Sequence, residues 1–297
     1  MRFRFSALAL AALLTGAALP AAAHDMWVNA RANVHDGGAV IVTSMGWGHD
    51  PLPIDEFMPG ARIGAYRVIG PDGSVLPLPF DPDANADLAV ATEGLPGMMR
   101  LQAGDAFVRR LQLTAEAPAG GYRVHAASPA RVFTTYVDAD GNRRSVALFA
   151  DEIAGARSIV SSAVSVREAT AWWTVGDWAA PRPAGAVIEL MPLADPAALR
   201  AGDSLPVRVL FRGEPVVAAM MPMFMAFGDG PVEPLVAEGA DGTATFTLPN
   251  PGHFILRAVI ELPTADAGAE FAAMVGRVDT IRFIATLATY VGPGAES

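Results

Sequence analysis

The short, regular spacing of turn signals is the feature that most constrains the fold. Five Asp-Gly pairs interrupt the sequence, at residues 36–37, 72–73, 140–141, 229–230 and 241–242. Between them lie segments rich in β-branched and aromatic residues, such as AVIVTSM and RVFTTYV. Asp-Gly turns between β-rich segments are typical of antiparallel hairpins. Outside residues 151–160, no ten-residue segment shows the periodicity of a helix. The sequence therefore predicts an all-β fold of the sandwich type.

Two β-sandwich domains in tandem are predicted from the way this pattern breaks. The segment WAAPRPAGA, residues 178–186, concentrates proline and glycine directly after a tryptophan-rich stretch. A chain of 297 residues is also long enough for about two domains of ordinary size. We expect an N-terminal β domain over residues 24–180, carrying the candidate metal site, and a C-terminal β-sandwich over residues 185–292.

The first 23 residues have the pattern of a secretory signal peptide. Two arginines, Arg2 and Arg4, precede an apolar run at 7–19, and small residues occupy positions 21 and 23. The apolar run is shorter than the ~20 residues that a membrane-spanning helix needs. We therefore expect cleavage after Ala23, export to the periplasm, and no transmembrane segment in the mature chain.

Composition excludes several classes of function. The chain has no cysteine, so a disulfide scaffold and a thiolate metal site are both excluded. Its formal net charge of −10 disfavours nucleic acid as a partner. The sequence also lacks a phosphate-binding Gly-Lys-Ser/Thr loop and a Gly-x-Ser-x-Gly nucleophile elbow. We therefore expect a binding protein rather than an enzyme.

Strand periodicity assigns two of the five histidines to a face. In the segments YRVHA, residues 122–126, and HFILRAVI, residues 253–260, alternate apolar residues mark the core face. This alternation leaves His125 and His253 on the opposite face of each strand. We expect both side chains to face solvent.

His24 carries the candidate metal chemistry. If the mature chain begins there, the free α-amine and the imidazole of this one residue can chelate a single ion. One further imidazole completes a histidine brace, which suits Cu(II) or Ni(II). His49 is the first choice for that ligand and His125 the reserve, whereas Asp25 or Asp50 would orient an imidazole from behind.

Other interpretations of these residues remain open. A second interpretation takes His24 as an exposed polar residue where cleavage happens to fall, and His49 as part of a turn with Asp50. The methionine-rich strand AAMMPMFMAF carries thioethers suited to Cu(I) at Met221, Met223 and Met225. Because both faces of this strand are apolar, core packing is the favoured interpretation there.

Four segments resemble a known family. They are AHDMWV, GHDPLP, the long stretch VIELMPLADPAALRAGDSLPVRVLFRGEPV, and DGTATFTLPNPGHFILRAVI. Together they resemble a periplasmic domain-of-unknown-function family whose members are often described as nickel uptake or cobalt/nickel transport accessory proteins. The resemblance implies two β domains, the second similar to carboxypeptidase regulatory modules, and a role in transition-metal binding or delivery. It also implies that His24 and His49 correspond to the histidines of that family.

The resulting hypothesis is a periplasmic protein that binds nickel, cobalt or copper and assists its uptake. Its partners would be the metal ion and a membrane metal transporter or an outer-membrane receptor. Two alternatives come from other classes: a copper-dependent histidine-brace oxidase with a tryptophan-lined substrate face, and an adhesion or scaffold module that binds no metal. Binding through imidazole and amine should weaken below about pH 6, because protons compete for the nitrogens.

Overall fold

The computed structural model describes residues 24–35, 38–48, 56–88, 90–91, 101–220, 223–226, 235–239 and 241–294. This part of the chain is almost entirely β-structure, with only short 3₁₀ helices between strands, so the predicted all-β fold is confirmed. The predicted signal peptide, residues 1–23, lies outside it. Among the helices in the described ranges, none is long and apolar enough to cross a membrane.

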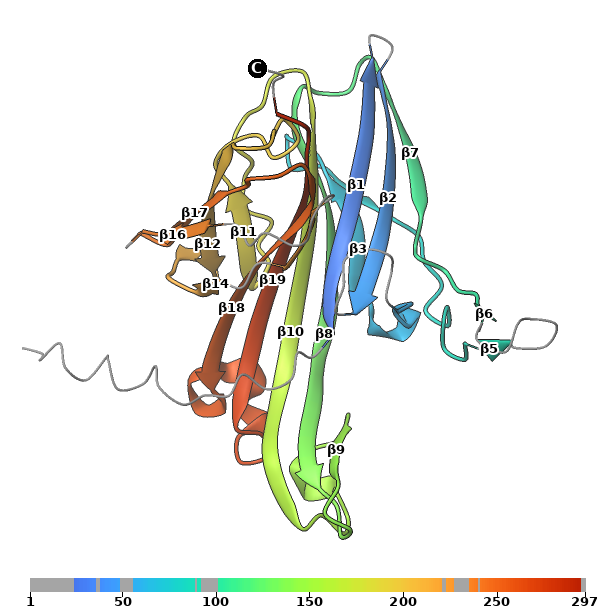
Figure 1. The fold of residues 1–297 in the computed structure, drawn as a ribbon, viewed down its shortest axis with the longest axis vertical. Coiled ribbons are helices and arrows are strands. Elements are labelled where there is room, and N and C mark those ends of the chain that lie inside the picture. Colours follow the sequence, from blue (N-terminus) through green and yellow to red (C-terminus); the bar gives the residue numbers. More distant parts are fainter. Residues whose placement is uncertain are drawn as a thin grey trace, which may run out of the picture.

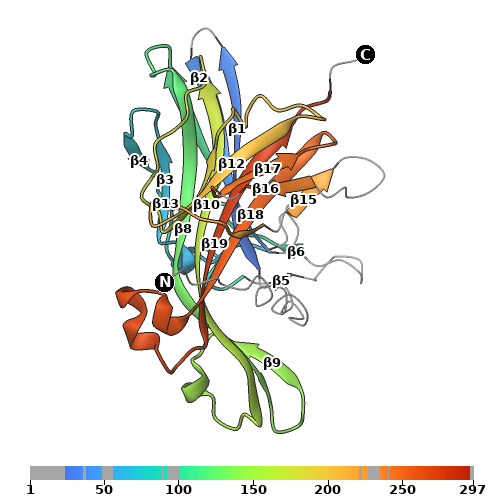
Figure 2. The same cartoon turned by 90° about the vertical axis from the view of Figure 1, so that its left-hand side faces the viewer.

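A large central sheet organises the molecule. Its strands follow the order β14-β18-β19-β10-β8-β3-β4, and β15 and β9 pair with β18 and β8. They are β3 (Ala65–Ile69), β4 (Val75–Pro77), β8 (Gly120–Val137), β9 (Arg143–Val146), β10 (Ser158–Val175), β14 (Ala219–Met220), β15 (Met223–Ala226), β18 (Gly252–Pro263) and β19 (Thr280–Val291). The lower ends of β8 and β10, with β9, extend beyond the other layers (Figures 1 and 2).

Smaller sheets and four 3₁₀ helices complete the described fold. One sheet contains β1 (Asp25–His35), β2 (Gly38–Gly48) and β7 (Arg109–Thr114). Another contains β11 (Ile188–Pro192), β12 (Ser204–Phe211), β13 (Glu214–Pro215), β16 (Leu235–Glu238) and β17 (Thr243–Thr247). A small ribbon pairs β5 (Val90–Ala91) with β6 (Leu101–Gln102). The helices are η1 (Gly60–Arg62), η2 (Ala150–Glu152), η3 (Thr264–Asp266) and η4 (Ala269–Met274).

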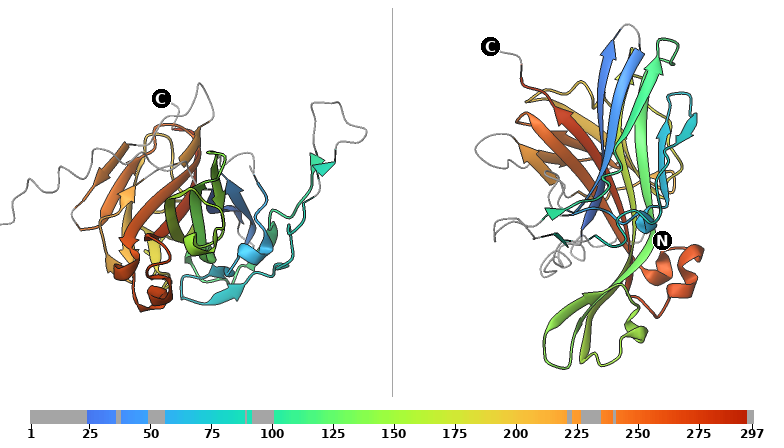
Figure 3. Two further views of the ribbon diagram at one scale, coloured as in Figure 1. Left: turned by 90° about the horizontal axis from the view of Figure 1, so that it is seen from below. Right: turned by 90° about the vertical axis from the view of Figure 1, so that its right-hand side faces the viewer.

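Each face of the central sheet is covered by one of these smaller sheets. The β1-β2-β7 sheet lies on one side and the sheet containing β11, β12, β16 and β17 on the other, as the views from the front and from below show (Figures 1 and 3). A hydrophobic core fills each interface. Trp27, Val124 and Trp173 belong to the core beneath β1, whereas Val207 and Phe283 belong to the core on the other side.

Strand β10 shows why burial on both faces hides a strand from sequence analysis. Ala171 and Trp173 pack in the core beneath β1, and the intervening Trp172 packs in the opposite core. A strand buried on both faces loses the alternation of apolar and polar residues that marks a half-exposed strand. The sequence therefore did not predict β10, although it is 18 residues long and lies at the centre of the sheet.

Strands from both halves of the chain join in the central sheet. β10 pairs in parallel with β19, from Ala163 opposite Thr280 to Ala171 opposite Ala288. β10 precedes the predicted domain boundary at residues 178–186, and β19 follows it. One continuous sheet therefore crosses that boundary in space, and the division into domains 24–180 and 185–292 stays a prediction.

The expectation that His125 and His253 face solvent is wrong. Their relative exposed areas are 2% and 0%. The period-2 rule assigned the faces correctly, since Val124 and Phe254 lie in the two cores. The opposite faces are nevertheless buried, because a second sheet covers the far side of each strand.

Candidate functional site

His24 lies at the start of β1, beside a glutamate. Its Nε2 atom is 3.3 Å from Oε1 of Glu56, and the two side chains are 31% and 49% exposed. The imidazole edge also contacts Trp47, at 5.7 Å between ring centroids and 78° between ring planes. A nitrogen donor and a carboxylate donor therefore meet at a position that solvent reaches.

Strand register brings these residues together. Asp25 of β1 pairs with Gly48, the last residue of β2, so His24 immediately precedes the final pair of this antiparallel ladder. After residues 49–55 the chain returns to the same place, where the backbone N–H of Glu56 donates to the carbonyl of Trp47 at 3.0 Å. His49 and Asp50 lie outside the described residues, but His49 is bonded to Gly48 and therefore follows the same end of the ladder.

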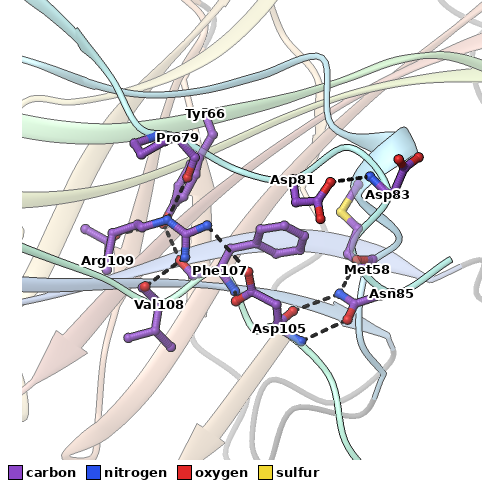
Figure 4. Close-up of polar contacts among 11 residues, drawn as sticks. Met58, Tyr66, Pro79, Asp81, Asp83, Asn85, Asp105, Phe107, Val108 and Arg109 are labelled. Carbon is purple, nitrogen blue, oxygen red and sulfur yellow. Dashed lines mark hydrogen bonds and ion pairs between the residues drawn. The ribbon is translucent and has the colours of Figure 1, made fainter. Parts of the chain in front are cut away.

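The segment that carries Glu56 is fixed by a half-buried asparagine (Figure 4). The amide nitrogen of Asn85 donates to the carbonyl oxygens of Met58 and Asp105, both at 2.8 Å, and its side-chain oxygen accepts from the Asp105 backbone at 2.8 Å. Asn85 adopts a left-handed φ of 61°, which asparagine tolerates better than most residues. Glu56 is thus two residues from an anchored, buried Met58.

Asp25, expected to orient an imidazole, is paired with an arginine, and its predicted role stays a prediction. Its Oδ2 atom lies 2.8 Å from Nη1 of Arg257, and the Asp25 side chain is buried. Arg167 is also buried nearby, where Nη1 donates to Ser165 at 2.6 Å. Burial lowers the pKa of Arg167 to about 10, opposed by the charge of Asp25 and reinforced by that of Arg257. Arg167 therefore stays charged at neutral pH.

The indole of Trp47 contacts both His24 and two arginines. The guanidinium carbon of Arg167 lies 5.3 Å from the ring centroid, and that of Arg62 lies 5.5 Å from it. Such cation–π contacts hold the ring in place against two guanidinium groups. The ring in turn gives His24 a rigid apolar support.

His125 is not brought together with His24. It lies on the face of β8 opposite Val124, which packs in the core beneath β1. Both of its ring nitrogens are engaged: Nδ1 accepts from Nε of Arg67 at 3.1 Å, and Nε2 lies 2.7 Å from Oε2 of Glu168. As the structure stands, His125 has no free nitrogen to offer a metal.

The methionine strand forms, but its side chains lie outside what is described. Met221 falls in a gap of the described ranges, whereas Met223 and Met225 belong to the backbone of β15. In the register, Met225 pairs with His253 of β18. The choice between core packing and Cu(I) binding for these methionines stays open.

Glu56 is the site residue that the sequence did not indicate. It stands in an acidic Asp-Glu pair that reads as an ordinary exposed turn, and its side chain is indeed half-exposed. Its proximity to His24 depends on the Trp47–Glu56 bridge, a contact between the ends of a loop. No local pattern specifies such a bridge.

An imidazole beside a carboxylate can form a hydrogen-bonded pair or coordinate a metal ion. Imidazole and carboxylate are both ligands for divalent transition ions, and an α-amine at His24 would add a second nitrogen. Within the described ranges, no group of three or more His, Cys, Asp and Glu side chains converges. The described pair therefore supplies two donors.

Comparison with known proteins identifies the family. Residues 21–262 match the family described as a domain of unknown function, DUF4198, and the chain belongs to it. No curated protein matches the chain. Among solved structures, murine CEACAM1b is similar at 9% identity and a TM-score of 0.19, with 90% of this chain and 100% of that chain covered. A likeness this distant indicates no shared function.

Proposed function

We propose that this protein is an exported transition-metal-binding protein whose site lies at the His24 end of the β1–β2 ladder. The observation that carries the proposal is the 3.3 Å approach of His24 Nε2 to Glu56 Oε1. Two side chains 32 positions apart in the sequence supply donors of the kind that divalent transition ions bind. In a chain that begins at His24, the α-amine would close a chelate ring with the imidazole of the same residue.

His49 is the proposed second imidazole. Gly48 pairs with Asp25, so positions 49 and 24 each adjoin the last pair of the ladder along the chain. Continuity of the chain therefore favours a meeting of the two histidines. The amine, two imidazoles and Glu56 would give a nitrogen-rich set with one oxygen, which suits Ni(II), Co(II) or Cu(II).

The surroundings favour capture and release. His24 and Glu56 keep 31% and 49% of their side-chain area exposed, so an ion bound there can pass to another protein. A carrier for nickel, cobalt or copper uptake that delivers its ion to a membrane transporter or receptor is the role we infer. Trp47, held by Arg62 and Arg167, keeps the imidazole in position without competing for the ion.

Calorimetric titration with Ni(II), Co(II) and Cu(II) tests this function. The protein starting at His24 should bind one ion, and His24→Ala should weaken binding at least 100-fold because it removes the anchoring imidazole. Glu56→Gln and His49→Ala should each cost about tenfold, the loss of about 1.4 kcal/mol. His35→Ala is the matched control, because His35 is an exposed histidine at the other end of the same ladder. Wild-type affinity in His24→Ala would refute the proposal.

A further inference from the structure

A second polar site lies on the other side of the central sheet, at its β3–β8 edge. It is a pocket of about 110 Å³ between these strands and residues 181–184, the segment that leads into β11. Three arginines, Arg67, Arg123 and Arg182, line it together with Trp172. Every lining residue belongs to the described part of the chain, and none of them is acidic.

The charge of this pocket is only partly balanced. Arg123 is buried and paired with Glu189, at 3.2 Å between Nη1 and Oε2. The carboxylate of Glu189 also accepts from the backbone N–H groups of Ala184 and Ala186 at 2.8 and 3.0 Å. Within the described ranges neither Arg67 nor Arg182 has a carboxylate within ion-pair distance. Two of the three guanidinium groups at the pocket therefore have no carboxylate paired with them directly among the described residues.

Arg67 is oriented by a buried hydrogen-bond chain. Its Nε donates to Nδ1 of His125 at 3.1 Å, which places the imidazole proton on Nε2. Nε2 then donates to the carboxylate of Glu168 at 2.7 Å. With Nε engaged, the two terminal nitrogens of Arg67 remain available at the lining of the pocket. This arrangement holds a guanidinium group ready for a ligand rather than leaving it to solvent.

Arg123 is fixed in a similar way. Its guanidinium carbon lies 5.1 Å from the ring centroid of Trp172, and its Nη2 donates to the carbonyl of Arg182 at 3.1 Å. That bond also ties the 181–184 segment to β8. Two strands and one connecting segment therefore each bring an arginine to the pocket. Buried side chains hold two of these arginines: His125 holds Arg67, and Glu189 holds Arg123.

We propose that this pocket binds a small oxyanion, such as inorganic phosphate or a carboxylate group. Arginine forks match the oxygen geometry of both groups and bind them through paired, charge-assisted hydrogen bonds. The volume is well below the ~300–1,000 Å³ of pockets for drug-sized ligands, so a single oxyanion group fits better than a nucleotide or a cofactor. This binding goes beyond the proposed metal function and is independent of it, because the pocket lies on the opposite face of the sheet from the core beneath β1.

Calorimetric titration of the full chain with sodium phosphate and with sodium acetate, at constant ionic strength set with chloride, tests the proposal. We expect saturable binding of one anion, weakened at least tenfold by Arg67→Met and by Arg182→Met. Arg182 is exposed, so its variant keeps the fold even if Arg67→Met does not. Arg110→Met, at an exposed arginine of β7, should bind as the wild type does.

The two anions separate the sources of the oxyanion. Tighter binding of phosphate assigns the pocket to a phosphate group, and tighter binding of acetate assigns it to a carboxylate. Absence of saturable binding of either anion would overturn the proposal. The proposal would also be overturned if Arg182→Met and Arg67→Met both bound the anion as tightly as the wild type does. Metal titration of the same variants should match wild type. The anion proposal can therefore be refuted while the metal proposal still holds.

Discussion

His125 and His253 lie on opposite faces of one sheet, both buried, yet their surroundings differ. Both nitrogens of His125 have partners, Arg67 and Glu168, within 3.1 Å. Neither nitrogen of His253 has a hydrogen-bond partner in the described structure. Its ring instead stacks on Tyr290, at 4.4 Å between centroids and 21° between planes.

The difference shows that a buried imidazole in this fold can be either hydrogen-bonded or without a hydrogen-bond partner. A buried imidazole that keeps its hydrogen bonds loses little on leaving water, whereas an unpaired one carries a desolvation cost of about 1–3 kcal/mol per group. The region around His125 is therefore a built polar network. The His253 ring is instead held by aromatic stacking, and its two nitrogens have no hydrogen-bond partner among the described residues.

The largest expected effect on the free energy of unfolding comes from breaking the buried ion pair between Arg123 and Glu189. Arg123→Met leaves the carboxylate of Glu189 buried without its cation, and we expect the free energy of unfolding to fall by about 3–5 kcal/mol. Urea denaturation at pH 7 measures the change. Arg143→Met, at an exposed arginine of β9, serves as the control and should be near neutral. A loss below about 1 kcal/mol for Arg123→Met would mean that the pair is not buried as described.

His125→Phe comes next in size. It keeps a ring of similar shape but deprives the Glu168 carboxylate of its 2.7 Å donor and Arg67 of its acceptor. We expect a loss of about 2–3 kcal/mol in the same denaturation assay. If the variant is as stable as the wild type, the network is not a source of stability and the contrast with His253 disappears.

His253→Phe should have the smallest effect at neutral pH and a distinct one in acid. Burial, together with the nearby charge of Arg31, lowers the pKa of His253 to about 4. The unfolded chain takes up a proton near pH 6.5 and the folded one does not, so stability falls as pH decreases from about 6.5 and levels off below about 4. This residue alone should cost about 2 kcal/mol between pH 7 and pH 5.

Removing the imidazole removes that acid sensitivity. At pH 7, His253→Phe should be neutral or stabilising, because phenylalanine brings no unsatisfied nitrogens into the core. Between pH 7 and 5 its stability should decline by about 2 kcal/mol less than that of the wild type. His35→Phe, at an exposed histidine, should decline as the wild type does. Parallel pH profiles for His253→Phe and wild type would show that His253 has partners in solution.

The sequence predicted local features of the fold better than their context. Turn spacing predicted the β class, and the alternation in 122–126 and 253–260 placed Val124 and Leu256 in the core. The sequence could not predict that a third layer also covers the opposite faces of these strands, because the covering strands come from distant segments of the chain. For the same reason β10 was missed and both histidines were assigned to solvent.

The candidate site was only partly accessible from sequence. The position of His24 behind the predicted cleavage site drew attention to it, and the structure adds Glu56 at 3.3 Å. That contact depends on the Trp47–Glu56 bridge across a loop, which no spacing rule encodes. The roles of His24, His49 and His125 as ligands stay predictions, although His125 already has both nitrogens engaged.

The most direct measurement compares Ni(II) and Cu(II) titrations of two proteins, one that begins at His24 and one with a single glycine added before it. The added residue removes the amine of His24 from chelation while it leaves the imidazole and Glu56 in place. We predict one tightly bound ion in the first protein and an affinity at least tenfold weaker in the second. Equal affinities, or no binding by either protein, would contradict a metal site at the start of β1.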